Sequence, residues 1–497
     1  MISQALRDAR RYEEIYEKEI SPAERPLFHL TPHCGWMNDP NGFGYYKGQF
    51  HLFYQYYPYA SVWGAMHWGH AVSMDLLHWS PLPAAMAPDQ VYDYKGCFSG
   101  SSIPMNDGRH LLMYTSVRQT SDPLGQGSGV QTQSIAIGNG VDYTKYGKNP
   151  VITADELPEG GSRFDFRDPK MWQASDGSYI AAVANNNADG GGQILLFKSK
   201  DLMNWKYWRV LAANKGRFGA MWECPDFFGL DGKHVLLVSP QDMLPDDFEY
   251  HNGNGTLCLI GSYDEKTGEF VEEKDQAIDY GIDFYAPQTV LTKDGRRIMI
   301  GWMQNWDACA IRSPHEKWAG QMSMPRELSV RDGRLYQNPI SEIDTMYLNT
   351  IIHRDVRIGG AEDVSLDGIY GRCMDLTVKV RPGDADKIFH RFSIRFAKKG
   401  KLRTSVSFRP HEKTVKIDRK YSGSCRAIVH QRRCLVPESA GGEITLRLIL
   451  DRFSVEVFIN DGRYAMTASI FTDLDAEGIS FYADGDVLID VEGHALG

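Results

Sequence analysis

The sequence has no long hydrophobic run, no closely spaced cysteine pair and no low-complexity segment, and these absences narrow the choice of protein class. No stretch approaches about 18 consecutive apolar residues, so a membrane partner is not expected. The first 20 residues alternate charged and apolar side chains instead of forming the apolar core of a secretory signal, which favours a cytoplasmic protein. The eight cysteines are widely scattered without a C-x-x-C pair, which favours free thiols over disulfides or a zinc site.

Basic residues are also in the minority, since 54 Lys and Arg face 64 Asp and Glu and the net charge is −10. A nucleic-acid partner is therefore not expected, because binding a phosphate backbone needs positive charge at the protein surface. What the sequence does contain is 42% hydrophobic residues, 12% aromatic residues, 48 Gly and 23 Pro in 497 residues. This composition predicts a soluble, multi-domain protein with many tight turns and β-strands.

A repeated turn organises the first two-thirds of the chain. Five times, a polar residue and a glycine precede a short apolar strand, a pattern typical of a β-hairpin. The five glycines are Gly48, Gly108, Gly177, Gly232 and Gly295, at spacings of 60, 69, 55 and 63 residues. The word SMDLLHW at 73–79 also recurs as SKDLMNW at 199–205. Units of roughly 60 residues with several short strands predict a five-bladed β-propeller over residues 28–338.

The remaining segments have different patterns. Residues 1–27 are charged and helical in character, so we expect a short, packed accessory helix at the N-terminus. Residues 339–355 include a short polar stretch and are predicted to be a linker. In 356–497, polar and apolar residues alternate through CMDLTVKV, HRFSIRFA, LRTSVSF, EITLRLIL, FSVEVFI and VLIDVEG, which predicts an antiparallel β-sandwich. The fold class is therefore expected to be all-β.

Counting back nine residues from each hairpin glycine gives five equivalent positions. They are occupied by Asp39, Ser99, Asp168, Glu223 and Ala286, within the words WMNDPNG, FSGS, FRDP, ECPD and FYAPQ. Equivalent inner positions of successive blades converge on the axis of a propeller, so three carboxylates are expected to meet there. Each word taken alone is an ordinary turn sequence, and Arg167 taken alone is equally well a salt-bridge partner of one of the acids. Their shared register favours a common function.

Clustered carboxylates have two chemical explanations, a metal site and acid–base catalysis. Calcium loops place several acidic ligands close together, and no D-x-D-x-D-G run occurs here, so no metal and no cofactor are expected. Glycosyl transfer instead needs one carboxylate to attack or stabilise a cationic sugar carbon and one carboxylic acid to protonate the leaving oxygen. The amide-rich neighbours of Asp39, namely Asn38, Asn41 and Gly42, are expected to keep it ionised. The apolar neighbours of Glu223 are expected to keep it protonated.

At these residues the sequence resembles glycoside hydrolase family 32, the invertases and β-fructofuranosidases, and within it the intracellular bacterial sucrose-6-phosphate hydrolases and sucrases. The likeness runs from about Arg25 to the C-terminus. The words that carry it are RPLFHLTPHCGWMNDPNG, FHLFYQYYP, WGAMHWGHAVSMDLLHW, GCFSGS, FRDPKMW, ECPDFF, FYAPQT, IGWMQNW, GQMSMPREL and LDRFSVEVFINDGRY.

The resemblance implies a five-bladed propeller with a sandwich, and a retaining β-fructofuranosidase. It implies that Asp39 is the nucleophile, Asp168 the acid that grips fructose hydroxyls, and Glu223 the acid/base. It also implies a set of fructosyl-subsite residues, namely Asn38, Gln55, Trp63, Phe98, Ser99 and Arg167, to which Tyr285 and Trp302 are added. The expected substrate is the terminal β-D-fructofuranosyl bond of sucrose, sucrose 6-phosphate or a short fructo-oligosaccharide.

Two alternatives remain open from the sequence. A fructosyltransferase would use the same three acids with a sugar acceptor in place of water. A non-catalytic fructan-binding protein is disfavoured by the intact acids. A basic cluster of Arg312, His315 and Lys317 is a candidate phosphate contact at the rim of the site, weighed against a solvated loop. For the second domain, packing support or a homodimer contact is favoured over a sugar-binding site.

Overall fold

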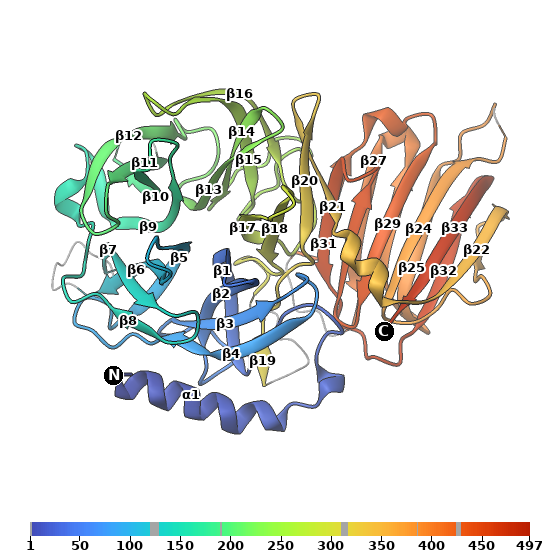
Figure 1. Cartoon of the computed structure of the whole chain (residues 1–497). Coiled ribbons are helices and arrows are strands. Elements are labelled where there is room, and N and C mark those ends of the chain that lie inside the picture. Colours follow the sequence, from blue (N-terminus) through green and yellow to red (C-terminus); the bar gives the residue numbers. More distant parts are fainter. Residues whose placement is uncertain (1, 120–128, 189–190, 310–316, 385, 424–428) are drawn as a thin grey trace.

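The computed structural model describes residues 2–119, 129–188, 191–309, 317–384, 386–423 and 429–497. Within these residues the chain folds as a β-propeller followed by a β-sandwich, with one α-helix at the N-terminus (Figure 1). The all-β prediction with a short N-terminal helix is therefore confirmed. No helix in the described part of the chain has the length and apolarity needed to cross a membrane.

In the described residues before 340, five small sheets follow one another along the chain. The first contains β1 (Gly35–Tyr46), β2 (Gln49–Tyr57), β3 (His67–Ser73), β4 (Trp79–Met86) and β19 (Trp318–Ala319). The second contains β5 (Gly96–Pro104), β6 (His110–Arg118), β7 (Val130–Gly138) and β8 (Tyr143–Lys145). The third contains β9 (Gly161–Gln173), β10 (Tyr179–Asn187), β11 (Gly191–Ser199) and β12 (Trp205–Ala213). The fourth contains β13 (Trp222–Leu230), β14 (Lys233–Pro240), β15 (Leu257–Asp264) and β16 (Glu269–Ala277). The fifth contains β17 (Tyr285–Leu291), β18 (Arg297–Trp302), β20 (Arg326–Arg331) and β21 (Arg334–Pro339).

The predicted hairpins form the start of these sheets. Each of the five glycines lies between the first and second strand of one sheet and has a positive φ, from 77° to 91°, which glycine adopts without strain. The first strands also contact one another in a closed ring, in the order β1, β5, β9, β13, β17 and back to β1. These strands therefore line the propeller axis. The first sheet is completed from far along the chain, because β19 pairs in parallel with the start of β1.

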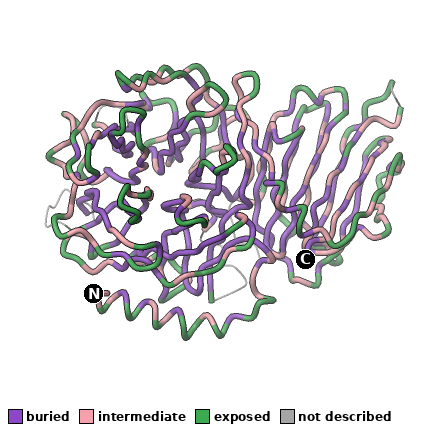
Figure 2. The backbone as a smooth tube through the Cα atoms, in the orientation of Figure 1, coloured by how far each residue is buried: buried purple, intermediate pink, exposed green. Residues whose placement is uncertain are grey.

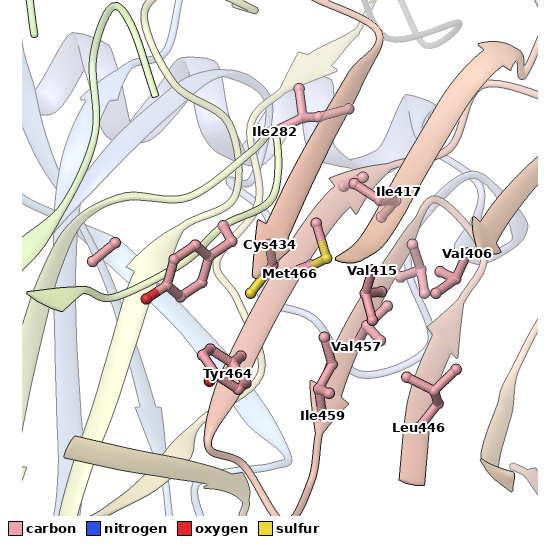
Figure 3. Packing of buried hydrophobic residues seen from close by; sticks show 14 of the residues in the cluster. Ile282, Val406, Val415, Ile417, Cys434, Leu446, Val457, Ile459, Tyr464 and Met466 are labelled. Atoms are coloured by element: carbon pink, nitrogen blue, oxygen red, sulfur yellow. The ribbon is translucent and has the colours of Figure 1, made fainter. Parts of the chain in front are cut away.

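The sandwich consists of two six-stranded sheets. One contains β22 (Tyr347–Ile358), β33 (Val487–Leu496), β24 (Met374–Pro382), β29 (Ile444–Asp451), β30 (Ser454–Ile459) and β31 (Tyr464–Ser469). The other contains β23 (Asp363–Val364), β32 (Gly478–Asp484), β25 (Arg391–Lys399), β26 (Leu402–Arg409), β27 (Thr414–Tyr421) and β28 (Gln431–Leu435). Figure 3 shows how aliphatic side chains of both sheets, such as Val406, Ile417, Leu446 and Val457, meet between them.

The stretch 339–355, predicted to be a linker, has regular structure instead. A 3₁₀-helix (Ser341–Met346) is followed by β22, which pairs with β33 in the sandwich. The prediction missed this strand because β22 is an edge strand whose side chains are mostly exposed, so that it lacks the alternation of a half-buried strand. The six strands that the alternation did predict correspond to β24, β25, β26, β29, β30 and β33.

The N-terminal helix α1 (Gln4–Tyr16) packs against β4. Leu6, Ala9 and Glu13 form its buried face, and the outer face is exposed (Figure 2). The Glu13 carboxylate accepts a hydrogen bond from the backbone N–H of Ala84, and Arg10 Nε donates to the Ala84 carbonyl. The seven cysteines in the described part of the chain are unpaired, as expected, and Cys425 lies outside it.

A buried ionic cluster joins the propeller to the sandwich. His29 lies 2.7 Å from Asp451 Oδ2 and 3.0 Å from Glu456 Oε1, and the side chains of all three are fully buried. Arg326 of β20 donates through Nε to Glu456 at 3.0 Å and lies 3.1 Å from Asp279. Because every charge in this junction cluster faces an opposite charge, the sandwich is fixed against the propeller without leaving an unpaired ion.

Candidate active site

All five first strands are distorted at the same place. Their pairing with the second strand shifts between Met37 and Pro40, Phe98 and Gly100, Arg167 and Lys170, Glu223 and Asp226, and Tyr285 and Gln288. Such β-bulges redirect side chains, and here they occur on the strands that line the axis. In four strands the distorted region includes or ends at a proline, whose missing N–H fits an interrupted ladder.

The bulges correct the predicted register at one position. The residues left unpaired include Asp39, Ser99, Asp168, Cys224 and Ala286. All of these but Ser99 stand directly before a proline, so Cys224 occupies the place predicted for Glu223. The hairpin loop of the fourth sheet has two residues between Leu230 and Lys233, as that of the first has between Tyr46 and Gln49. The first strand still keeps the count of nine because it has a second irregularity between Asn41 and Gly44, which the fourth strand lacks. Glu223 therefore matches Asn38, Phe98, Arg167 and Tyr285, one residue earlier in each strand.

One group of contacts surrounds Asp39 and Asp168. Ser99 Oγ donates to Asp39 Oδ2 at 2.9 Å, and the Cys224 thiol lies 3.6 Å from both Asp39 Oδ2 and Asp168 Oδ2. The backbone N–H of Cys224 donates to Asp168 Oδ2 at 3.0 Å, and that of Asp168 donates to Thr115 Oγ1 at 2.8 Å. Three strands of the axis thus bring two carboxylates to the same thiol.

A second group of contacts surrounds Glu223. Arg167 Nε lies 2.9 Å from Glu223 Oε1 and 4.0 Å from Asp168 Oδ2, so it connects the two acids. Tyr285 Oη donates to Glu223 Oε2 at 2.7 Å, and Gln241 Nε2 donates to the same oxygen at 3.0 Å. The expectation of an apolar setting for Glu223 is wrong, because tertiary contacts bring three donors to its carboxylate.

The expectation for Asp39 is met for Asn38 but not for Asn41. Burial and the nearby Glu223 carboxylate raise the pKa of Asp39 to about 6, although the Ser99 and Asn38 side chains oppose the shift by donating hydrogen bonds. Asn41 instead accepts a hydrogen bond from Gly100, so it does not stabilise Asp39 as expected. Asp39 Oδ1 is buried and has no hydrogen-bond partner among the described residues. The site therefore keeps one carboxylate oxygen unengaged.

Asp168 has a raised pKa as well. Burial is the main cause and the Glu223 carboxylate adds to it, while the Arg167 guanidinium opposes both. Its backbone is left-handed, with φ 63°, and Cys224 and Ala286 at the equivalent bulges have φ 50° and 52°. Each such conformation costs a non-glycine residue about 1–2 kcal/mol. Strain of this kind at three bulges on one axis is typical of a functional site.

The other predicted residues lie around these acids. Asn38 Oδ1 accepts a hydrogen bond from the Trp36 indole at 2.7 Å, and Gln55 Nε2 donates to the Cys97 carbonyl at 3.0 Å. Trp302 is buried, and its ring packs edge-on against Trp36. Phe98 is half-buried and packs against the same apolar cluster as Tyr285 and Trp302.

Trp63 is the one predicted residue with a largely open side chain. It is 49% exposed, and its ring centroid lies 6.0 Å from that of Phe98 at an angle of 74°. This places Trp63 beside the cluster rather than inside it. Of the basic cluster, Arg312 and His315 lie outside the described residues. Lys317 donates to the Glu19 carbonyl and so holds the N-terminal segment.

Sequence reasoning missed three contributors. Cys224 was hidden by the one-residue error in register. Thr115 and Gln241 lie on the second strand or just beyond it, at 16 and 18 residues from their partners Ser99 and Glu223. The sequence does contain a signal for Thr115 and Gln241. Each follows a hairpin that returns the chain to the end of the axis where the predicted acids lie.

Comparison with known proteins gives a consistent result. The sequence matches the Glycosyl hydrolases family 32 N-terminal domain over residues 29–339 and the Glycosyl hydrolases family 32 C terminal domain over residues 342–494. It is 35% identical over 468 residues to raffinose invertase of Escherichia coli, covering 93% of each chain. It is 33% identical over 480 residues to sucrose-6-phosphate hydrolase of Zymomonas mobilis, covering 94% of this chain and 90% of that one.

The fold is also shared with solved structures. The GH32 β-fructofuranosidase of Bombyx mori superimposes with a TM-score of 0.83 at 35% identity, over 99% of this chain and 98% of that one. The matched domains cover the propeller and the sandwich, and the propeller match contains all three carboxylates. The chain therefore belongs to glycoside hydrolase family 32 and is a glycoside hydrolase.

Proposed function

We propose that this enzyme is a retaining β-fructofuranosidase that hydrolyses the terminal non-reducing β-D-fructofuranosyl bond of sucrose, sucrose 6-phosphate or short fructo-oligosaccharides. The observation that carries the proposal is the meeting of Asp39, Asp168 and Glu223 on three inner strands, linked by Arg167 and the Cys224 thiol. Support comes from relatives of similar length, which include a raffinose invertase and sucrose-6-phosphate hydrolases, and from the Bombyx mori enzyme, a variant of which was solved with sucrose.

Asp39 is suited to the role of nucleophile. Its Oδ2 accepts the hydrogen bond from Ser99, whereas its Oδ1 is left without a partner among the described residues. The free oxygen attacks the anomeric carbon of fructose, a C–O bond to Asp39 forms, and the bond to the leaving oxygen breaks. Water then attacks the same carbon and releases Asp39, so two inversions give net retention.

Glu223 is suited to the role of acid and then base. It gives its proton to the leaving oxygen in the first step and takes a proton from water in the second. The donors Arg167, Tyr285 and Gln241 stabilise the carboxylate that forms as the proton leaves. They also fix the orientation of the carboxyl group, which keeps the proton on the path to the leaving oxygen.

Asp168 is assigned to the fructose hydroxyls. Its Oδ2 is bound by the Cys224 N–H, which fixes the carboxyl group between the other two acids. Hydrogen bonds from sugar hydroxyls to Asp168 strengthen as positive charge develops on the ring, so they stabilise the transition state more than bound substrate. Replacing Asp168 by Asn should therefore lower kcat more than it raises KM.

The test is an assay of free glucose against free fructose with sucrose as substrate. Equal release supports hydrolysis, an excess of glucose indicates transfer of fructose to another sugar, and release of neither with any tested fructoside contradicts an enzyme of this specificity. Repeating it with sucrose 6-phosphate, short inulin oligomers and long levan identifies the leaving group. Glu223→Gln should stop release, whereas Glu272→Gln, which removes a surface partner of Arg217, should not.

A further inference from the structure

A cavity lies toward the end of the propeller axis opposite the carboxylates of Asp39, Asp168 and Glu223. It has a volume of about 450 Å³ and is lined by the hairpin halves of the first strands, including Lys170 and Trp172 of β9, Phe227 of β13 and Thr289 of β17. A strand advances about 3.3 Å per residue, so Lys170 lies roughly 7 Å and Trp172 roughly 13 Å along β9 from Asp168. None of the three acids lines the cavity, which extends away from them along the same strands.

Two cations line this cavity and one buried carboxylate lies behind it. Lys170 Nζ lies 2.8 Å from Asp226 Oδ2 and donates to the Thr289 carbonyl at 3.0 Å. The Arg297 guanidinium lies 4.7 Å from the centre of the Phe228 ring and makes one long hydrogen bond, 3.4 Å to Thr289 Oγ1.

The charge of Arg297 is only partly matched within the described part of the chain, because burial lowers the pKa of its guanidinium and the nearby Asp226 carboxylate opposes that shift. Its Nε is buried without a hydrogen-bond partner among the described residues. Asp226, which also influences Arg297, directs its Oδ2 to Lys170 and leaves its own Oδ1 without a partner there. Burial lowers the pKa of Lys170 and the neighbouring Arg297 lowers it further, although Asp226 opposes both. Glu265, the acidic residue in the lining, is already bound by the backbone N–H and hydroxyl of Ser175. A buried donor without a partner is unfavourable by about 1–3 kcal/mol, which an anionic ligand would relieve.

The other side of the cavity is aromatic. The Phe227 ring centroid lies 5.7 Å from that of Trp172 and 4.9 Å from that of Tyr263, and Tyr263 Oη is buried without a partner among the described residues. Aromatic rings with a polar tip suit a ligand that has an apolar face and hydroxyl groups. The cavity thus combines a cationic side with an aromatic side.

We propose that this cavity binds a small organic anion, with its phosphate or carboxylate group at Arg297 and Lys170 and a hydroxylated ring against Trp172 and Tyr263. The planar guanidinium presents paired N–H donors that match two oxygens of an oxyanion. The cavity volume accommodates a molecule of the size of a hexose phosphate. Because the cavity extends away from the three acids, a ligand of the acids and the proposed anion bind at the same time.

Titration calorimetry on the full chain tests this, with saturating fructose present to occupy the site of the three acids. Glucose 6-phosphate and glucuronate are the probes, and glucose and inorganic phosphate are the controls for ring and charge alone. We expect one molecule of anionic sugar bound per chain and weaker or no binding of glucose. Tighter binding of glucose 6-phosphate would identify the phosphate as the recognised group, and tighter binding of glucuronate the carboxylate.

Arg297→Gln should weaken binding of the preferred probe by about tenfold to a hundredfold, because it removes a charge-assisted hydrogen bond. Arg209→Gln is the matched control, since Arg209 also has a buried Nε without a partner but does not line the cavity. Should Arg297→Gln fail to fold, Arg297→Lys takes its place. Lysine keeps the charge but loses the paired N–H donors of the guanidinium, so binding should be weaker than in the unaltered chain by a smaller factor than that expected for Arg297→Gln. No binding to the unaltered chain at millimolar probe, displacement by fructose, or equal affinity in the Arg297 variants would overturn the proposal.

Discussion

Two clusters of buried carboxylates lie in this molecule, and they are held in opposite ways. At the junction of propeller and sandwich, Asp451 and Glu456 face His29 and Arg326, and these partners lower the pKa of both acids, that of Asp451 to about 2. On the propeller axis, burial raises the pKa of Asp39 to about 6 and leaves one of its oxygens without a partner among the described residues.

This difference assigns the two clusters to different tasks, the junction cluster to stability and the cluster on the axis to chemistry. In the junction cluster the charges are matched, so the carboxylates have no capacity left for a ligand and act to hold two domains together. On the axis, like charges are held close, one oxygen is unengaged and the backbone of Asp168 is strained. Such an arrangement opposes folding, and is expected where a bound substrate completes the interactions. Removing a carboxylate should therefore have opposite consequences in the two places.

The largest effect is expected from Asp39→Asn on the axis. Turnover of sucrose should fall by about 10⁴-fold or more, because an amide does not form the covalent intermediate. The free energy of unfolding should not fall, and at pH 7 it should rise by about 3 kcal/mol. The pKa of Asp39 is higher in the folded than in the unfolded chain, so its ionisation weakens folding progressively between about pH 4 and pH 6.

Urea unfolding at pH 4 and pH 7, together with kcat, checks this prediction. The gain in stability over the unaltered enzyme should be present at pH 7 and absent at pH 4. A variant that is less stable at pH 7, or that retains more than about a thousandth of the turnover, would contradict the assignment of Asp39 to chemistry rather than structure.

The next largest effect is expected from Asp451→Asn in the junction cluster. The free energy of unfolding should fall by about 3–5 kcal/mol, because His29 is left charged and partly unpaired in a fully buried place. Among molecules that remain folded, kcat should change by less than about twofold, since Asp451 belongs to the sandwich. Denaturant unfolding and kcat measured on the same sample check both halves, and a large loss of kcat with unchanged stability would reverse the comparison.

The pH dependence sharpens this prediction. The two carboxylates raise the pKa of His29 to about 9 despite its burial, so its contribution to stability is complete below about pH 6.5 and disappears as the pH rises through 9. The contribution of Asp451 is complete above about pH 4 and disappears as the pH falls through 2. The gap in stability between the unaltered enzyme and Asp451→Asn should thus be widest between about pH 4 and 6.5. A gap that widens above pH 9 would contradict the cluster as described.

A smaller effect is expected from Tyr285→Phe. The change removes the hydrogen bond to Glu223 but keeps the ring, so kcat/KM for sucrose should fall by about tenfold. The matched control is Tyr250→Phe, because Tyr250 also donates to a carboxylate, that of Asp275, outside the site. Steady-state kinetics compare the two variants, and an equal loss in both would show that Tyr285 acts only through packing.

The smallest effect is expected from Ser99→Ala, which removes a donor to Asp39 Oδ2. Without that bond the ionised form of Asp39 is less favoured, so its pKa should rise further. The acidic limb of the pH profile of kcat/KM reports ionisation of the free enzyme. It should therefore move to higher pH by roughly 0.5–1 unit. Ser116→Ala, in the same sheet but bonded to Thr132 and Ser134, should leave the limb in place. A downward shift would contradict the assigned donor.

Much of the fold could be predicted because its elements repeat. The hairpin glycines mark the first strand of each propeller sheet, and the alternation of residues marks the central sandwich strands. Edge strands such as β22 and the two-residue strand β23 could not be predicted in the same way. Their side chains are exposed or their length too short for a period to develop.

The residues of the site could likewise be predicted only where the features that define them are close in sequence. The positions of Asp39 and Asp168 follow from local words, because the bulge, the proline and the hairpin that define them are all close in sequence. The surroundings of Glu223 do not, since Arg167 and Tyr285 reach it from 56 and 62 residues away. Only tertiary structure shows that an acid between Trp222 and Cys224-Pro225 is surrounded by donors.

The most direct test of the account is the anomeric form of the first product. Fructose released from sucrose is observed by NMR at low temperature before mutarotation, and with methanol present the methyl fructofuranoside, which does not mutarotate, is identified. Attack by Asp39 followed by attack of water or methanol predicts β-fructofuranose and methyl β-fructofuranoside. Release of the α-anomer would mean a single displacement by water, and Asp39 would then not be the nucleophile.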